Sequence, residues 1–487
     1  MALKYLVKAR LLDSPRRGAF AITERGLEVF NSGIEKKDNS FLRQYPEFVR
    51  FQKEKSKSTE TARERLRRIS NPLPKGGVTV KFYNQERMMT LSKDRTPSDS
   101  ADAAVAHYNL GVTYQNRGEH IKAIKAFKQV IRIDPDDAET NYNLGIAYSN
   151  LGRLKEALET YKQAIRIDPN FAIAHNNLGL AYRKLGRYEE ELEAYKQAIR
   201  IDPDCVEAHF NLGNAYRKLG CYEEALEAYN QTIRIKPDFA DAHFNLGVAY
   251  AKLGRTNEAV EAYKQAIRID PDAADAHYSV GVAYQDKGEN KKAIKAYKQA
   301  IRIKPGYAKA HFNLGVAYAN LGRTKEAVEA YKKSIRIDPD DAKAHCNLGY
   351  SYYKLGRYTE AIETFKQSIH ISPDVADPHY SVGFTYLNLG RYEEAVEAYK
   401  EAIRIDPDQA RDYSNLGASY TLLGRHEEAV EAYKQAIRIK PDYVDAHFAL
   451  GRGYLFLGDR GSVLEQYKIL KTLDKDKANE LFNVIYK

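Results

Sequence analysis

Residues 243–254 read HFNLGVAYAKLG, and residues 256–269 read TNEAVEAYKQAIRI. In both stretches the apolar residues recur every three or four positions, which is the spacing of one face of an α-helix. Gly254 stands between them, where a helix ends most easily on a residue that can adopt a left-handed backbone, and a proline follows the second stretch. The two stretches therefore predict a pair of amphipathic helices joined by a tight turn.

This pair of helices recurs with a fixed period of 34 residues. A glycine within the first helix occurs at positions 111, 145, 179, 213, 247, 281, 315, 349, 383, 417 and 451. A tyrosine follows each of these glycines by three residues, a second glycine follows by seven, and a proline recurs ten times from Pro135 to Pro441. Such a period predicts eleven stacked helix–turn–helix repeats over residues 104–477, with a capping helix over residues 478–487.

The first glycine of each repeat lies inside a helix, where glycine costs about 1 kcal/mol relative to alanine. Its presence in all eleven repeats indicates that two helices approach too closely for a side chain. A small residue in the second helix supports this interpretation, with alanine at positions 123, 157, 225, 259, 293, 327, 361, 395 and 429. Glu191 and Val463 replace this alanine in the third and eleventh repeats, and we expect looser packing around Glu191.

These recurring positions resemble the signature of the tetratricopeptide repeat family. In the first repeat the matching residues are Leu110, Gly111, Tyr114, Ala123, Phe127 and Pro135. The resemblance implies an all-α, right-handed superhelical solenoid whose first helices line a concave groove. It also implies a non-catalytic scaffold that binds a protein or peptide partner.

The position two residues before the first glycine carries an amide in most repeats. The asparagines are Asn109, Asn143, Asn177, Asn211, Asn245, Asn313, Asn347 and Asn415, and Ser279, Ser381 and Ala449 complete the series. An amide both donates and accepts hydrogen bonds, so a ladder of amides could hold the backbone of an extended peptide without reading its sequence. This arrangement is similar to the asparagine ladder in the repeat domain of the O-linked N-acetylglucosamine transferase. The alternative is that these asparagines have a structural role within the repeat.

Neighbouring positions of the first helices predict selectivity. Repeats three to five carry a basic stretch, which consists of Arg183, Lys184, Arg217, Lys218 and Lys252. Repeats eight to eleven carry an apolar stretch, which consists of Tyr350, Tyr353, Phe384, Leu387, Leu422, Leu455 and Phe456. These two stretches predict a partner segment with an acidic part and an apolar end. In the alternative, the charges are solvated and the apolar residues pack beneath the C-terminal helix.

Several classes of function are disfavoured by the sequence. No stretch approaches the roughly 18–20 consecutive apolar residues of a membrane span. The three cysteines Cys205, Cys221 and Cys346 lack the spacing of a metal site, and nine histidines from His107 to His447 share one framework position, which predicts packing residues. Walker-type glycine loops, nucleophile elbows and zinc signatures are absent. We expect a cytoplasmic protein that is not an enzyme, needs no cofactor and has no membrane partner.

The N-terminal region differs in charge from the repeats. Residues 1–100 contain 22 basic and 12 acidic residues, whereas the remainder contains 54 of each, so the whole net charge of +10 lies in the first hundred residues. This asymmetry suggests a separate module with a partner of its own, for which nucleic acid is one candidate. In the alternative, the segment is a remnant or a protein-docking module.

The stretches SPRRGAFAITERG and FLRQYPEFVRFQK resemble the N-terminal winged-helix domain of the Mrr-type restriction endonuclease family. We expect an incomplete winged-helix-like α/β segment over residues 1–55, with a hairpin whose tip is residues 16–18, and a basic linker of low order over residues 56–103. The resemblance implies contact with DNA, for which the candidate phosphate-binding residues are Lys4, Lys8, Arg10, Arg16 and Arg17. The alternative function is therefore a DNA-tethered adaptor that recruits a protein through its repeats.

Overall fold

The computed structural model describes residues 12–16, 19–22 and 98–485 of the chain. Two units are separated between Asp94 and Arg95. In the first unit, β1 (Leu12–Arg16) and β2 (Ala19–Ile22) form an antiparallel pair in which Leu12 lies opposite Ile22 and Arg16 lies opposite Ala19. These strands flank the expected hairpin tip. The rest of the expected winged-helix segment, and the linker as far as residue 97, lie outside the described residues.

The second unit contains twenty-three α-helices between residues 98 and 485. The first helices of the repeats, called A helices below, are α7 (Ser98–Asn116), α9 (Ala138–Asn150), α11 (Ala172–Lys184), α13 (Val206–Leu219), α15 (Ala240–Lys252), α17 (Ala274–Asp286), α19 (Ala308–Asn320), α21 (Ala342–Lys354), α23 (Ala376–Asn388), α25 (Ala410–Leu422) and α27 (Val444–Phe456). The second helices, called B helices, are α8 (His120–Ile133), α10 (Leu154–Ile167), α12 (Tyr188–Ile201), α14 (Tyr222–Ile235), α16 (Thr256–Ile269), α18 (Asn290–Ile303), α20 (Thr324–Ile337), α22 (Tyr358–Ile371), α24 (Tyr392–Ile405), α26 (His426–Ile439) and α28 (Arg460–Leu473). The helix α29 (Lys475–Ile485) follows them.

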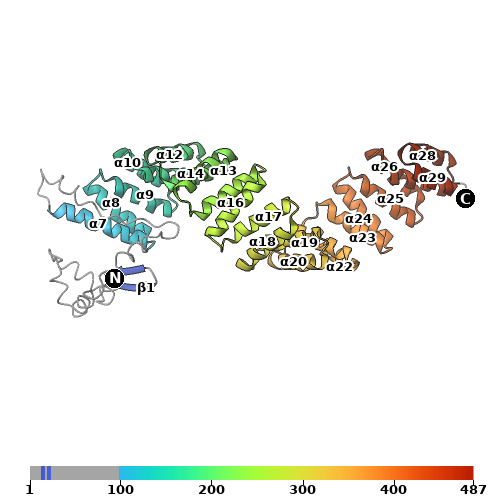
Figure 1. Cartoon of the computed structure of the whole chain (residues 1–487), viewed down its shortest axis with the longest axis horizontal. Helices are drawn as coiled ribbons and strands as arrows, with labels where there is room; N and C mark the ends of the chain where they lie inside the picture. The colour runs from blue at the N-terminus through green and yellow to red at the C-terminus, as the bar shows by residue number, and fades with distance from the viewer. Residues whose placement is uncertain (1–11, 17–18, 23–97, 486–487) are drawn as a thin grey trace. The chain divides into compact units, whose positions relative to one another are not determined.

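The helices of this unit stack in chain order (Figure 1). Each A helix packs against the B helix that follows it, and each B helix packs against the next A helix. This arrangement confirms the predicted solenoid of eleven repeats. Two boundaries differ from the expectation: α7 begins at Ser98, within the predicted linker, and α29 begins at Lys475. The second difference has a local cause, because the Asp474 carboxylate accepts hydrogen bonds from the backbone N–H groups of Asp476 and Lys477, both at 3.0 Å.

Each repeat turns between its two helices at the second glycine. All eleven of these glycines have positive φ, from +70° to +82°, as in Gly152 at +73°. The backbone N–H of Arg153 then donates to the carbonyl of Tyr148 at 2.9 Å and satisfies one of the free carbonyls at the end of α9. Because other residues rarely adopt this backbone conformation, the glycine fixes where each A helix stops.

In the first ten repeats, the first glycine lets an aromatic ring of the B helix lie directly against the A helix. A Cβ atom added at Gly281 would lie 2.5 Å from a ring carbon of Tyr297, and the corresponding distances in eight other repeats are 2.5–2.7 Å. Real Cβ atoms do not come so close to a ring carbon, so any side chain would force the two helices apart. The predicted close approach is confirmed, and Tyr297 is fully buried.

Consecutive repeats are linked by cations that flank the recurring tyrosine of the A helix. The guanidinium of Arg357 lies 4.5 Å from the ring centroid of Tyr352, and Nζ of Lys332, from the preceding B helix, lies 5.7 Å away. The same pair of contacts occurs around Tyr386, where Arg391 lies at 4.5 Å and Lys366 at 5.7 Å. Each contact contributes about 0.5–1 kcal/mol at exposed sites. Their repetition strengthens every junction at which it occurs.

The nine framework histidines include seven that bond to the backbone of the preceding turn. Their Nε2 atoms lie 2.9–3.1 Å from proline carbonyl oxygens, at His209, His243, His277, His311, His345, His379 and His447. A carbonyl can only accept, so the Nε2–H tautomer donates. This contact gives the histidines the packing role that the sequence predicts for them.

The two ends of the array differ in how much apolar surface they leave exposed. In the A helices from α9 to α27, the leucine or valine just before the first glycine is buried against the preceding B helix, as in Leu314 at 7% exposed, whereas Leu110 of α7 is 42% exposed. At the other end α29 packs on α27 and α28, and Leu481 lies where a Cβ of Gly451 would meet it at 2.7 Å. The amphipathic α29 therefore buries its apolar face against the last repeat.

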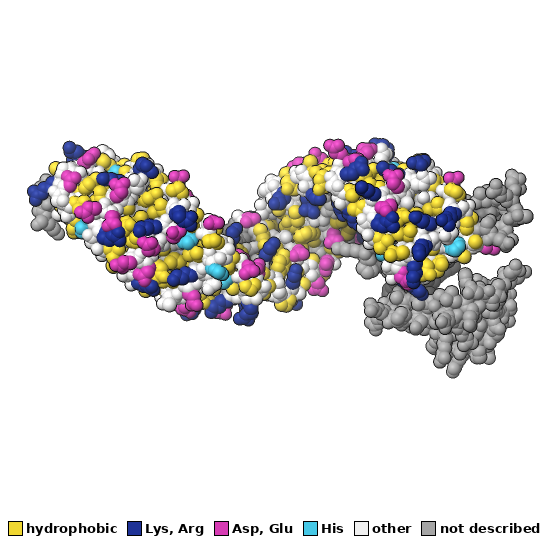
Figure 2. All heavy atoms as spheres, turned by 180° about the vertical axis from the view of Figure 1, so that it is seen from behind, with side chains coloured by type: hydrophobic (Ala, Val, Ile, Leu, Met, Phe, Trp, Pro, Cys, Tyr) yellow, Lys and Arg dark blue, Asp and Glu magenta, His cyan; other side chains and the backbone are white. Residues whose placement is uncertain are grey.

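The surface charges of the array are mixed. On the face drawn in Figure 2, acidic and basic side chains alternate along the repeats. Many form pairs within the first turn of a B helix, such as Arg153 with Glu156 and Arg391 with Glu394. Exposed pairs of this kind contribute between 0 and about 1 kcal/mol each. Selectivity for a partner therefore depends on local departures from this balanced pattern.

We predict that Gly281→Ala destabilises the array by about 1–3 kcal/mol, because the new methyl group overlaps the ring of Tyr297. Gly383→Ala is the matched control: its Cβ would lie 3.0 Å from the nearest ring carbon of Tyr399, so the higher helix propensity of alanine offsets most of the cost. Urea denaturation followed by circular dichroism compares the two variants. Equal losses of stability would contradict the close-approach explanation.

Candidate functional site

The A helices line the inner face of the array. Almost every A helix contacts the next A helix across the repeat boundary, as α11 contacts α13, whereas consecutive B helices in the described part lie farther apart. A stack in which one row of helices is more closely spaced curves toward that row. The side chains that the A helices turn away from their own B helices therefore share one continuous inner face.

The asparagines of this face form hydrogen bonds between repeats. Nδ2 of Asn177 donates to the Tyr142 hydroxyl at 2.9 Å, and Nδ2 of Asn313 donates to the Tyr278 hydroxyl at 2.9 Å. Asn143 and Asn415 make the same bond at 3.0 and 3.1 Å. In each case the tyrosine lies 35 residues earlier, in the preceding A helix. One donor of each amide is thus used to join neighbouring repeats.

The hydrogen bonds of the remaining asparagines depend on which residue replaces this tyrosine 35 positions earlier. Asn211 donates to Asn176 Oδ1 at 3.0 Å, because residue 176 is an asparagine. Asn245 turns instead to Asn214 Oδ1 at 3.1 Å, since Phe210 offers no hydroxyl. Asn347 faces the same situation with Phe312, and no side-chain hydrogen bond of Asn347 occurs in the described structure. The sequence signal for each bond is therefore the residue 35 positions before the asparagine, which immediately precedes the equivalent position of the preceding repeat.

Burial limits what each amide can offer to a guest. Asn143 is buried, Asn109 is exposed, and the other asparagines are half-buried, namely Asn177, Asn211, Asn245, Asn313, Asn347 and Asn415. A half-buried amide that has donated one N–H keeps a second N–H, and both groups can reach a ligand only from the inner face. Peptide binding by this ladder stays a prediction, and Asn143 is the member least able to contribute.

The basic stretch lies at the C-terminal ends of α11, α13 and α15. Arg183 and Arg217 are half-buried, and Lys184, Lys218 and Lys252 are exposed. Arg217 Nε donates to the Tyr229 hydroxyl at 3.3 Å, and Lys218 Nζ lies 3.2 Å from the Tyr188 hydroxyl. Cations are favourable at helix C-termini because the helix dipole is negative there. No acidic side chain pairs with these five residues within 4.0 Å in the described structure, so their charges are available to an anion.

The apolar stretch forms a layer of aromatic rings. The ring centroids of Tyr353 and Phe384 are 5.6 Å apart, and Phe384 stacks on Tyr380 at 6.0 Å. Tyr350 remains 38% exposed and accepts a hydrogen bond from Ser381 at 2.7 Å. These aromatic side chains come from α21 and α23, so the structure brings them together across one repeat boundary.

Towards the end of the array the apolar stretch is divided. Leu455 packs with the cluster formed by α28 and α29, as the alternative interpretation of the sequence expected. Leu422 is 55% exposed, and Phe456 is 57% exposed with its ring stacked on His426 at 4.5 Å. The last two therefore still offer apolar surface outside the contact with α29.

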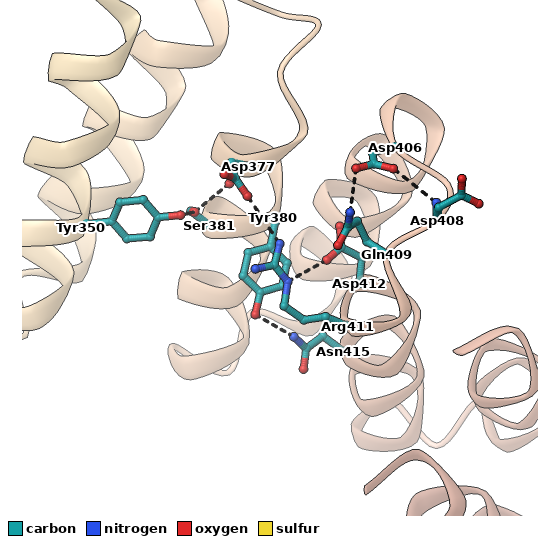
Figure 3. A network of polar contacts seen from close by, with 10 residues as sticks. All are labelled: Tyr350, Asp377, Tyr380, Ser381, Asp406, Asp408, Gln409, Arg411, Asp412 and Asn415. Atoms are coloured by element: carbon teal, nitrogen blue, oxygen red, sulfur yellow. Dashed lines mark hydrogen bonds and ion pairs between the residues drawn. The ribbon is translucent and has the colours of Figure 1, made fainter. Parts of the chain in front are cut away.

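One polar cluster in repeats nine and ten was not singled out from the sequence. Figure 3 shows Arg411 lying across the ring of Tyr380, at 3.6 Å from its centroid, between two carboxylates. Arg411 Nε donates to Asp412 Oδ1 at 3.1 Å, and Nη2 donates to Asp377 Oδ1 at 3.5 Å. Burial raises the pKa of the Asp412 carboxyl, while Arg411 opposes that rise. The signal in the sequence is ARDYS over residues 410–414, where the fifth repeat reads ADAHF.

Glu191 is another buried acid of the array, besides Asp412 and Asp137. It is 1% exposed, and neither of its carboxylate oxygens has a hydrogen-bond partner. Burial raises the pKa of this carboxyl, and the nearby charges of Arg183 and Lys218 lower it. The looser packing expected there is not seen: the Glu191 side chain is enclosed, and both of its carboxyl oxygens lack a hydrogen-bond partner.

Other chemistry receives little support from the described residues. Burial raises the pKa of the Cys346 thiol to about 12, so this cysteine is a poor nucleophile at neutral pH. Across the described ranges there is no group of three or more metal-ligating side chains. None of the helices in those ranges is both long and apolar enough to cross a membrane. Of the candidate DNA-binding residues, Arg16 is the last residue of β1, and Lys4, Lys8, Arg10 and Arg17 lie outside the described residues.

Comparison with known proteins supports the repeat assignment. Family models described as TPR repeat match seven overlapping segments within residues 150–390, and models described as tetratricopeptide repeat match residues 104–137, 126–159 and 374–442. None of these matches includes the N-terminal region that resembles a winged helix. No curated protein matches the chain.

Three solved structures illustrate the similarity of this chain to known repeat proteins. MamA is 33% identical, with a TM-score of 0.33, over 34% of this chain and 97% of that one. YrrB, described as a TPR protein with an unusual peptide-binding site, is 25% identical, with a TM-score of 0.35, over 38% of this chain and 96% of that one. A chain of the Cut9–Hcn1 complex is 14% identical, with a TM-score of 0.39, over 82% of this chain and 98% of that one.

The bonds between repeats predict different costs for two equivalent asparagines. Asn313→Ala should destabilise the array by about 1 kcal/mol, because the hydrogen bond from Asn313 to the Tyr278 hydroxyl is lost. Asn347→Ala should cost less, since Asn347 makes no corresponding bond. Thermal denaturation of both variants under the same conditions measures the difference. If Asn347→Ala is the more damaging change, the proposed link between repeats is wrong.

Proposed function

We propose, because this chain belongs to the tetratricopeptide repeat family, that it is a non-catalytic scaffold that binds an extended segment of a partner protein along its inner face. The observation that carries the proposal is the contrast within one array. Residues that hold the repeats together are nearly the same in each repeat, whereas the inner-face residues of neighbouring A helices differ. A surface that varies on a constant framework is typical of recognition rather than of folding.

The half-buried asparagines supply contacts that do not depend on the guest's side chains. Extended peptides present one N–H and one C=O per residue, and an amide can pair with either. Asn347 keeps its whole side-chain amide for such a contact, while Asn177 and Asn313 have already used one donor. The ladder would therefore hold the guest most firmly where the bonds between repeats are missing.

The guest we propose has an acidic part and an apolar end. The basic stretch, with no carboxylate paired to it, favours the acidic part at repeats three to five. The exposed rings and leucines of repeats eight to eleven favour the apolar end, because burial of apolar surface contributes about 25 cal/mol per Å². The three free cysteines agree with a reducing compartment, and the cytoplasm is the location we propose.

The experiment compares two variants that each remove five positive charges. In the first, Arg183, Lys184, Arg217, Lys218 and Lys252 become alanine. In the matched control, five exposed arginines in the last turns of B helices become alanine, at positions 166, 200, 234, 268 and 302. We expect the first variant to bind a fluorescent hexa-aspartate peptide at least about tenfold more weakly, and the control to change affinity much less. Equal losses would show that only net charge matters.

A second candidate function is a DNA-tethered adaptor, which is favoured by the confinement of the net positive charge to residues 1–100. We expect the full chain to retard duplex DNA in a gel at low salt, and to lose this ability as salt rises, because phosphate contacts release counterions. Changing Lys4, Lys8, Arg10, Arg16 and Arg17 to alanine should weaken retardation. A full chain that leaves DNA mobility unchanged at about 50 mM salt would remove this candidate.

A further inference from the structure

The position occupied by Glu191 is built for a small residue. In nine other repeats the equivalent residue is alanine, and all nine alanines are fully buried between helices. Glu191 is enclosed to nearly the same extent, and both of its oxygens lack a hydrogen bond. The hydroxyl of Tyr195, one helical turn later, is also buried without a partner. Burial of a carboxylate without a partner is costly, so its presence calls for compensation from nearby charge.

The compensating charges belong to the basic stretch. The helix α12, which carries Glu191 and Tyr195, packs against α11 and α13. The charges on those helices that lower the pKa of the Glu191 carboxyl are those of Arg183 of α11 and Lys218 of α13. The fourth repeat supports this arrangement. There Arg217 and Tyr229 are the equivalents of Arg183 and Tyr195, and Arg217 Nε donates to the Tyr229 hydroxyl at 3.3 Å.

Arg183 and Lys218 also reach the inner face. Arg183 is half-buried, and Lys218 is exposed with Nζ 4.7 Å from the Tyr188 ring centroid. Neither makes an ion pair within 4.0 Å in the described structure. The two cations therefore act on the buried carboxylate of Glu191 and have no acidic partner of their own in the described structure.

We propose that Glu191 is the internal counter-charge of an anion-binding site made by Arg183 and Lys218, and that it takes up a proton when a guest carboxylate binds there. This inference rests on the proposed function, and it names the part of the inner face that receives the acidic part of the guest. The proton comes from solvent, and no covalent bond changes.

The physical reason is competition between two carboxylates for the same cations. A guest carboxylate brings a second negative charge close to Glu191, and like charges that share a site cannot both stay ionised at low cost. The guest remains hydrated at the groove surface, whereas Glu191 is enclosed, so Glu191 is the group that becomes neutral. The pKa of Glu191 is then higher in the complex than in the free protein.

The sign of the pH dependence follows from this difference. Because the complex holds more protons than the free protein, affinity is greatest at low pH and weakens as pH rises through the pKa of Glu191 in the complex. Glu191→Ala removes the internal carboxylate, so its affinity should lack this component of the pH dependence. It should also bind an acidic guest more tightly than the unmodified chain at high pH, since Arg183 and Lys218 then face only the guest.

The test uses the full chain and a fluorescein-labelled hexa-aspartate peptide, with anisotropy measured from about pH 5.5 to 8.0 at constant ionic strength. Aspartate has an ordinary pKa of about 3.9, so the probe itself stays ionised over this range. We expect the affinity of the unmodified chain to fall about threefold to tenfold across the range, which is within the limit for uptake of one proton. Glu191→Ala should lose most of this fall.

Glu190→Ala is the matched control, because Glu190 precedes Glu191 on α12 but pairs with Arg187 at the surface. It should keep the pH dependence of the unmodified chain, and this comparison removes the contribution of histidines that titrate in the same range. If Glu191→Ala shows the same slope and affinity as the unmodified chain, the counter-charge role is overturned while the basic stretch remains a binding site. If no variant binds the probe, the proposed acidic guest is overturned as well.

Discussion

The contact between the first glycine of the A helix and an aromatic ring of its B helix, made in the first ten repeats, determines the rest of the array. The ring of Tyr297 occupies the space that any side chain at Gly281 would need. This contact sets the separation of the two helices, and the repeated separation sets how one helical pair meets the next. The inner face exists because this geometry recurs often enough for the A helices to lie side by side. Recognition is thus a property of the stack, since a single repeat would present only one helix to a guest.

A second consequence concerns the asparagines. Had they served the guest alone, they would have no reason to bond within the protein, yet Asn177 and Asn313 each donate to a tyrosine of the preceding A helix. A bond across the repeat boundary restricts how far two repeats can rotate against each other. Pre-organised amides lose less conformational entropy when a guest binds. The observed bonds are therefore compatible with the proposed binding role, because one donor of the amide joins the repeats and the other is left for a guest.

The sequence predicted the features that depend on local chain geometry. The period fixed the number of repeats, and Gly254 and its equivalents have the left-handed backbone that the helix ends required. The bonds from asparagine to tyrosine were not predicted, because they join positions 35 residues apart. They depend on the relative orientation of two consecutive repeats, which the sequence period does not give. The pairing of Arg411 with Asp412 was missed for a different reason. Its residues are common on surfaces, and although the sequence shows Asp412 in place of an alanine, only the structure shows that Asp412 is buried and bonds to Arg411.

Glu191 and Asp412 show how a uniform array can acquire a distinct site. Both replace small residues of the framework, and the charge of an A-helix arginine acts on each carboxyl. Asp412 bonds directly to Arg411 and holds it flat on Tyr380, so that guanidinium has little freedom left. Glu191 makes no such bond, and Arg183 makes no ion pair in the described structure. Because each repeat contacts only its neighbours, the cost of such an acid stays local and the rest of the array keeps its stability. A repeat protein can therefore change the electrostatic properties of its inner face through a buried substitution, while the exposed residue stays the same.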